Sequence, residues 1–468
     1  MAGLSLESGR LRAKKRISPE ALAEESLKQV MLGGHAAGSR ITERWIVDRF
    51  AVTHAQAREA LHHLEKRGAL TLTPRRGARL IELEEASPAE MRPVWLALIE
   101  LAVRLAVERD AVPEPAPEAV PDDRWGRYKA VESALTALGE ASGNARLTQA
   151  LQRLAVEAAA SQPADSAIQS EALTTLIAEL AARRVRSAEK LIPRTFAVSP
   201  RRPDARAVAD QALRGVFSVP AVEESRLAPG IRKYFEGLAT RIGHPLDRAP
   251  AAAQHLAAEI RQQIQFGEIR PGDAIREQPL AEAFGVSRGP VRDALRLLDR
   301  HGLISLQGRR GAFVKRFSAK GAIDIGQVRA ALSGVQMAEA ARVPVKPDWI
   351  EPELRAGIAL LRDIAEDPDC PVSNYILVRR AVAIVTLAAG GNTVVGRLAT
   401  ELESEVTTLW AMVFSKQRQR KSAETWAEIA DAILERDEAR ARAGGRRIVE
   451  EAFTAALQTP EFHTTAIG

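Results

Sequence analysis

The sequence predicts a mainly α-helical protein in which one folding unit occurs twice. Residues 51–80 and 285–314 align without a gap, and about a third of the aligned positions are identical. Aromatic residues make up only 4% of the chain, whereas the helix formers Ala, Leu, Arg and Glu are abundant. A repeat on the scale of a domain, together with this composition, indicates two related and largely helical halves.

Each repeat begins with a pattern typical of three helices followed by a two-stranded hairpin. Apolar residues recur at helical spacing and then alternate around a basic, glycine-bearing tip. The first copy predicts helices at 19–32, 43–50 and 53–67 and a hairpin at 69–82. The second copy predicts helices at 254–266, 279–284 and 287–300 and a hairpin at 303–314.

Helical periodicity follows each copy and predicts an all-helical bundle there. The expected helices are 87–110, 122–160 and 165–192 after the first copy, and 318–342, 346–366, 372–389, 392–414 and 422–458 after the second. The segment 197–250 is rich in Pro and Arg, which predicts an irregular connection with one or two short helices. The expected domains are therefore 15–84, 85–196, 251–317 and 318–460, joined by 197–250.

Charge and apolar patterning limit the possible partners. A formal net charge of +6 and a sequence pI of about 9.6 favour an anionic partner such as nucleic acid. No stretch approaches the roughly eighteen apolar residues that span a bilayer, and the first residues lack the apolar core of a signal peptide. We therefore expect a cytoplasmic protein without a membrane partner. The single cysteine, Cys370, excludes intrachain disulfides and sites with several thiolates.

Three helices and a hairpin are the layout of a winged helix-turn-helix, whose third helix enters the major groove of DNA. In the second copy, Ser287 follows a short turn and is expected to cap this helix. Arg288, Arg292 and Arg296 are four residues apart and hence share one face of the helix. An arginine there can bind guanine O6 and N7 together. Singly, each arginine is more typical of a solvated helix surface, but the combination occurs twice and favours DNA binding.

The predicted wing tips are also basic. Arg309 and Arg310 precede Gly311, and the glycine allows the backbone to approach a phosphate closely. The first copy repeats the pattern with Arg75 and Arg76 before Gly77.

The stretch GVSRGPVRDALRLLDRHGLI resembles the core motif of the GntR family of transcription regulators. The resemblance covers residues 254–316, and the first copy is similar but weaker. It implies that double-stranded operator DNA is the partner and that the residue after Glu277 contributes to binding. The expected DNA-binding residues are Ser287, Arg288, Gly289, Arg292, Arg296, Gln278, Arg309, Arg310 and Gly311 in the second copy, and Arg44, Thr53, His54, Arg58, Arg75, Arg76 and Gly77 in the first.

The two copies depart from the family pattern at different positions. Gln278 stands where the first copy has Arg44, and His54 stands where the second copy has Arg288. Thr53 matches Ser287, and Arg58 matches Arg292. Each copy thus keeps part of the set of expected DNA contacts. We therefore expect the two winged helices, the readers of the DNA sequence, to prefer different half-sites.

The helical segments resemble the FCD effector domain, a bundle that binds small carboxylates, commonly through a metal held by one Asp and three His. The landmarks ASGN at 141–144 and AGGN at 389–392 carry this resemblance. At the ligand positions, however, the second bundle has Arg379, Ala383, Trp426 and Ile448. The eight histidines of the chain all lie outside 87–243 and 318–458. We therefore expect no histidine-based metal site and no cofactor in either bundle.

One residue of the second bundle resembles a ligand-binding position of the FCD domain. Arg329 resembles the residue whose guanidinium pairs with an effector carboxylate, and Leu96 is expected to be its counterpart in the first half. A surface arginine without a ligand is the alternative for Arg329. Trp426 is expected to fill the core rather than contact a ligand.

The expected function is that of a transcription regulator, a repressor that reads an imperfect palindrome and responds to a small carboxylate. The chain would act either as a pseudo-dimer by itself or as a homodimer. An effector-independent architectural or protein-interaction role is the alternative. An enzyme is not expected, because the bundles lack histidine for a catalytic triad, and the roughly 150 residues after each reader are too few for a pyridoxal-phosphate aminotransferase.

Overall fold

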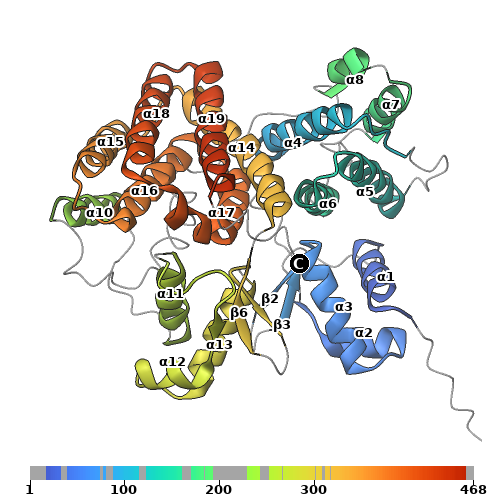
Figure 1. Cartoon of the computed structure of the whole chain (residues 1–468). Helices are drawn as coiled ribbons and strands as arrows, with labels where there is room; N and C mark the ends of the chain where they lie inside the picture. The colour runs from blue at the N-terminus through green and yellow to red at the C-terminus, as the bar shows by residue number, and fades with distance from the viewer. Residues whose placement is uncertain are drawn as a thin grey trace, which may run out of the picture. The chain divides into compact units, whose positions relative to one another are not determined.

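The computed structural model describes residues 17–32, 40–73, 77–80, 88–114, 123–160, 170–183, 185–192, 229–242, 252–265, 267–300, 302–307, 311–316 and 318–459. The chain forms two compact units. Figure 1 shows the helices and strands, coloured from the N-terminus to the C-terminus. The first unit comprises Met1–Glu85, Ala106–Gly143 and Thr148–Ala197. The second comprises Ala86–Leu105, Asn144–Leu147 and Val198–Gly468. The units therefore do not follow the repeat, because two segments from the first half belong to the second unit.

The first winged helix lies in the first unit. Its helices are α1 (Pro19–Leu32), α2 (Glu43–Phe50) and α3 (His54–Lys66). Its strands are β1 (Arg40–Ile41), β2 (Leu70–Thr73) and β3 (Gly77–Leu80), in the antiparallel order β1-β3-β2. Leu22, Ile46 and Leu64 fill the core between the helices and the sheet, each at most 1% exposed.

The second winged helix repeats this arrangement in the second unit. Its helices are α11 (Ala252–Gln265), α12 (Glu277–Ala283) and α13 (Arg288–Arg300). Its strands are β4 (Ala274–Ile275), β5 (Ile304–Leu306) and β6 (Ala312–Val314), in the order β4-β6-β5. Both wings thus gain a third strand beside the predicted hairpin. These extra strands are two residues long, too short to show a period in the sequence.

The apolar face of α13 fixes its place in the second winged helix. Val291, Leu295 and Leu298 are at most 2% exposed and belong to one core cluster with Ile260 of α11. Burying each of these side chains contributes about 1.5–3 kcal/mol. The opposite face of α13 is left to solvent, because the arginines occupy the positions between the buried residues.

The second bundle is built from six long helices. They are α14 (Ala319–Arg342), α15 (Ile350–Glu366), α16 (Val372–Gly390), α17 (Thr393–Val413), α18 (Lys416–Leu434) and α19 (Glu438–Leu457). The helices α14 and α19 pack very closely, since a Cβ at Gly445 would lie 2.6 Å from the Ser333 carbonyl oxygen. Within the described residues, α16 alone is long and apolar enough to cross a membrane, but 83% of its apolar window is buried. Its composition therefore suits the centre of the bundle.

A further helix, α10 (Pro229–Ile242), lies in the segment predicted to be an irregular connection. It packs on α15 and α16, where the Tyr234 hydroxyl donates to the Glu353 carbonyl at 3.2 Å. The rest of 197–250 lies outside the described residues.

The first half contributes α4 (Pro88–Glu108), α5 (Arg124–Ala141), α6 (Ala145–Ala160), α7 (Ser170–Ala181) and α8 (Val185–Leu191). Three segments predicted as single helices, 122–160, 165–192 and 422–458, are each broken in two. The chain adopts a positive φ at Gly143, Arg183 and Arg436, which ends the preceding helix. Periodicity missed these breaks because the apolar spacing resumes within a few residues.

Candidate nucleic-acid interface

The exposed face of α13 carries Arg288, Arg292 and Arg296, as the spacing predicted. Arg292 is held in a fixed orientation by Glu277 at the start of α12. Its Nε donates to one carboxylate oxygen at 3.0 Å, and its Nη2 donates to the other at 2.8 Å. The hydrogen bonds from Arg292 hold the pKa of Glu277 below its usual range. An exposed pair of this kind adds little stability, so its main effect is to orient the guanidinium.

The first winged helix contains the same pair. Arg58 donates from Nε and Nη2 to the two carboxylate oxygens of Glu43, at 2.9 and 3.2 Å. These hydrogen bonds likewise lower the pKa of Glu43. Neither glutamate was predicted from the sequence to be part of the site. The available signal was a Glu fifteen residues before the Arg in both copies.

The positions beside this pair differ between the two copies. In the second copy, Arg288 donates to the side-chain oxygen of Gln278, and Gln278 donates to Glu282 at 2.5 Å. In the first copy, Arg44 instead pairs with Asp48 at 3.5 Å, and the Arg44 side chain is 86% exposed. The second copy thus presents three arginines and a glutamine.

His54 replaces Arg288 in the first copy and turns toward the glutamate. Its Nδ1 lies 3.6 Å from the Glu43 carboxylate, which also holds Arg58. The first copy thus presents two arginines, Arg44 and Arg58, and a histidine.

The N-terminus of the third helix is also built differently. Thr53 forms a capping box with Gln56, because the Gln56 amide donates to the Thr53 hydroxyl oxygen at 3.3 Å and the Thr53 amide donates to the Gln56 side chain at 3.1 Å. Ser287 makes no such bond in the described structure. The third position of α13 is Pro290, which has no N–H to donate. The predicted cap by Ser287 is therefore wrong in this respect, and its exposed hydroxyl stays available to a phosphate, next to the exposed Gly289.

Only part of each wing tip can be placed. Arg75, Arg76, Arg309 and Arg310 lie outside the described residues. Gly77 begins β3, and Gly311 precedes β6 with a φ of 94°. A side chain at Gly311 would strain the backbone, so glycine is required by the turn itself.

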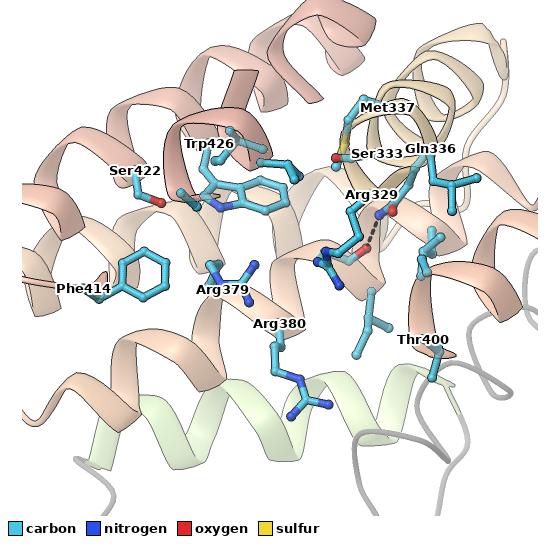
Figure 2. A pocket seen from close by; sticks show the side chains of 18 residues that line it. Arg329, Ser333, Gln336, Met337, Arg379, Arg380, Thr400, Phe414, Ser422 and Trp426 are labelled. Atoms are coloured by element: carbon cyan, nitrogen blue, oxygen red, sulfur yellow. Dashed lines mark hydrogen bonds between the residues drawn. The ribbon is translucent and has the colours of Figure 1, made fainter. Parts of the chain in front are cut away.

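A second candidate site is a cavity of about 90 Å³ inside the second bundle. Five residues that the FCD resemblance singled out line this one cavity: Arg329, Arg379, Ala383, Trp426 and Ile448. Figure 2 shows the guanidinium groups of Arg329 and Arg379 directed toward one another below Trp426, whereas Arg380 points away from them. The cavity thus brings together the positions of the second bundle that the sequence resemblance singled out.

The lining groups suit an anion. Arg379 is 9% exposed, and its guanidinium carbon lies 5.8 Å from the centre of the Phe414 ring. Trp426 is 3% exposed, as expected for a core residue, but its indole N–H has no partner in the described part of the chain. A buried donor of this kind favours a ligand that accepts a hydrogen bond. Among the described residues, no group of three or more His, Cys, Asp or Glu could hold a metal ion.

The fold defines a winged-helix protein with a helical bundle, and comparison with known families agrees. The family described as bacterial regulatory proteins, gntR family, matches residues 20–80 and again 252–314. The FCD domain matches residues 324–451. The chain therefore carries the gntR-family DNA-binding domain twice and an FCD domain in its second half.

Similar proteins are named as transcription regulators, not as enzymes. The HTH-type regulator YdhC of Bacillus subtilis is 38% identical over 71 residues, which cover 15% of this chain and 32% of that protein. A probable D-xylose utilization operon repressor of Paenarthrobacter nicotinovorans is 27% identical over 203 residues, covering 42% of this chain and 84% of that protein. The chain spans about a third of the length of the first curated relatives.

Among solved structures, E. coli McbR/YncC is 18% identical, with a TM-score of 0.40. The superposition covers 45% of this chain and 99% of that one.

Proposed function

We propose that the chain is a cytoplasmic, sequence-specific repressor that binds one operator with both winged helices. The observation that carries this proposal is the repeated pair of Glu43 with Arg58 and Glu277 with Arg292, which orients an exposed arginine on each third helix. A guanidinium held in this way presents its remaining N–H groups to a base edge or a phosphate. Repression is supported by relatives that are named as repressors.

The operator would be an imperfect palindrome. Winged helices that act in pairs read half-sites about 34 Å apart, which is one turn of the duplex. Two readers in one chain reach an effective concentration of about millimolar, so the second half-site binds readily once the first is occupied. Because Gln278 and Arg288 are replaced by Arg44 and His54 in the first copy, the two half-sites would differ in sequence.

Selection of bound DNA fragments with the full chain tests this function. Arg292→Ala and Arg58→Ala should each reduce affinity by about 1–3 kcal/mol and relax a different half-site. Arg355→Ala is a matched control, because Arg355 is an exposed helical arginine of the bundle that pairs with Glu351. Equal binding of genomic and random fragments at moderate ionic strength would contradict the function.

We further propose that a small carboxylate binds in the arginine-lined cavity and releases the operator. The volume of the cavity accommodates several non-hydrogen atoms. Arg329 and Arg379 would bind the carboxylate, and the Trp426 indole would donate to it.

A route from the cavity to the second winged helix passes through Arg261 of α11. Burial, together with the charge of Arg380, lowers the pKa of Arg261 to about 10. Arg380 lines the cavity, so an anion bound there would weaken the repulsion between these two arginines. The packing of α11 on the bundle would change as a result.

Calorimetric titration with C3 to C6 mono-, di- and tricarboxylates tests the effector. Arg329→Ala should abolish the effect of the ligand on operator affinity and leave the affinity of the free protein nearly unchanged, whereas Arg355→Ala should change neither. If no carboxylate alters operator affinity, the bundle acts without an effector, as in the architectural alternative.

A further inference from the structure

Two buried asparagines, one from each repeat, contact an acidic residue of the other repeat. The Asn144 side-chain amide donates to the Asp324 carbonyl at 3.0 Å, and the Ala145 backbone amide donates to the Asp324 carboxylate at 3.3 Å. The Asn392 side-chain amide donates to the Glu90 carbonyl at 2.9 Å, and the Thr393 backbone amide donates to the Glu90 carboxylate at 2.7 Å. All of these residues belong to the second compact unit.

The Asn144–Asp324 and Asn392–Glu90 contacts involve matching positions of the two repeats. The register that aligns 51–80 with 285–314 continues without a gap to pair Glu90 with Asp324. The ASGN and AGGN landmarks pair Asn144 with Asn392. In each repeat, the acidic residue therefore accepts a hydrogen bond from the asparagine of the other repeat. Such an exchange is the pattern of an isologous, two-fold interface, here between unequal halves of one chain.

Each asparagine has a fixed orientation because it makes two kinds of bond. The Asn144 oxygen accepts from the Leu147 amide at 2.9 Å and caps α6, and the Asn392 oxygen accepts from the Val395 amide at 3.0 Å and caps α17. With the oxygen used in this way, the side-chain amide must point at the opposite acid. The acid meets the first backbone amide of each helix, which has no partner within its own helix.

The four residues that make these contacts are buried, so losing one of the hydrogen bonds would cost free energy. Glu90, Asp324, Asn144 and Asn392 are 5%, 6%, 2% and 4% exposed. Breaking a hydrogen bond in such a place leaves a buried polar group without its partner, which is unfavourable. The two acids are supported differently, since Lys320 lies 2.9 Å from the Asp324 carboxylate, whereas the Thr393 hydroxyl donates to Glu90 at 2.9 Å.

We propose that these contacts form an intramolecular joint that pairs the two repeats as two subunits pair in a symmetric dimer. The partner of this surface is the other repeat of the same chain, and a second copy of the chain is not needed. If the joint also lets one chain occupy a whole operator, that consequence rests on the function proposed above. The joint itself does not depend on that function.

Amide hydrogen exchange on the full chain tests the joint directly. Glu90→Ala removes the acceptor of the Thr393 amide, so peptides containing Thr393, 303 residues away, should exchange roughly 10-fold faster. Asp324→Ala should do the same to the Ala145 amide. Unchanged exchange in both variants would overturn the proposal.

Isosteric variants separate the joint from the helix caps. Asn144→Asp and Asn392→Asp keep the capping oxygen but replace the amide donor with a carboxylate oxygen. This oxygen faces the backbone carbonyl of the opposite acid and adds a negative charge near its carboxylate, so the thermal midpoint should fall by several degrees. Adding Glu90→Gln to Asn392→Asp should restore part of the loss. Asn374→Asp is the matched control, because Asn374 is buried in the same bundle and its amide lies 3.5 Å from the Cys370 sulfur. This control should leave exchange at Ala145 and Thr393 unchanged.

Native mass spectrometry at micromolar concentration completes the test. The full chain should have the mass of one copy, 50.8 kDa. A mass of two copies that Asn144→Asp and Asn392→Asp reduce to one would overturn the proposal, because the contacts would then lie between chains. If the Asp variants do not fold, Thr393→Val removes only the hydroxyl bond to Glu90 and should still speed exchange at Thr393. Since no DNA is used, these results are independent of operator binding.

Discussion

The two winged helices hold one arginine in the same way and differ in the residues around it. Arg58 and Arg292 are each bound by a glutamate through two hydrogen bonds of about 3 Å. Beside them, Arg288 and its glutamine partner are replaced by His54 and an arginine that pairs with Asp48. Under the proposed function, we expect the orienting carboxylate to serve both winged helices in the same way, whereas the neighbouring positions would set the DNA sequence that each winged helix prefers.

The two bundles diverge further than the readers. In the register that pairs Glu90 with Asp324, Trp95 lies opposite Arg329, so the expected counterpart Leu96 is wrong by one residue. Trp95 is fully buried, whereas Arg329 lines the cavity. Among its described residues, the first half also has no counterpart of α15, because no described helix lies between α4 and α5. The second half thus keeps a candidate ligand site, whereas the first half has a buried tryptophan at the matching position.

The largest expected effect comes from removing one reader at a time. Leu64 and Leu298 are counterparts, each at most 1% exposed, so Leu64→Ala and Leu298→Ala should each destabilise their own winged helix by about 2–5 kcal/mol. Hydrogen exchange would show which winged helix unfolds, and footprinting would show which half-site is lost. Loss of both half-sites in either variant would mean that the readers do not act separately.

Exchanging His54 and Arg288, which lie beside the shared arginine, tests whether this position sets the DNA sequence that each winged helix prefers. His54→Arg should make the first reader resemble the second, whereas Arg288→His should make the reverse change. Each variant should shift binding of the affected half-site by about 1–3 kcal/mol, measured with operators that carry two copies of one half-site. If neither variant alters the preferred sequence, the differing positions do not specify it.

The turn before the third helix offers a reciprocal pair of stability variants. Ala51 and its counterpart Gly285 both have a positive φ, 53° and 61°, which strains alanine but not glycine. Ala51→Gly should therefore stabilise the first winged helix by up to about 1 kcal/mol, and Gly285→Ala should destabilise the second by about as much. Thermal unfolding monitored separately for each winged helix measures both changes in stability. If both variants were stabilised, or both destabilised, the positive φ would not be the cause.

The smallest effect is the pH dependence of the two orienting pairs. The pKa values of Glu43 and Glu277 are lowered by their arginines, so the stabilisation is complete above the usual range of a glutamate and is lost as pH falls through the lowered values. Carbon-13 NMR of the two side-chain carboxylates should show both titrating below the usual range of a glutamate. A pKa of either group within or above that range would mean that the pair does not persist in solution.

Much of this architecture could be predicted from local patterns. The helices α1, α2, α3 and α13 were predicted to within about two residues, because their apolar spacing and flanking glycines act over single turns. The exposed arginines of α13 could be predicted for the same reason, since a spacing of four fixes one face. By contrast, Glu43 and Glu277 could not be recognised as site residues, because their arginines belong to the next helix.

The sequence by itself determined the duplication, the type of each winged helix, the basic face of α13 and the absence of histidine from both bundles. These properties depend on composition and on spacings of a few residues. Only the tertiary structure decided that Arg329, Arg379 and Trp426 line one cavity and that Asn144 and Asn392 reach the acids of the opposite repeat. Such contacts join residues up to 303 positions apart. They depend on how buried helices pack, which no local pattern records.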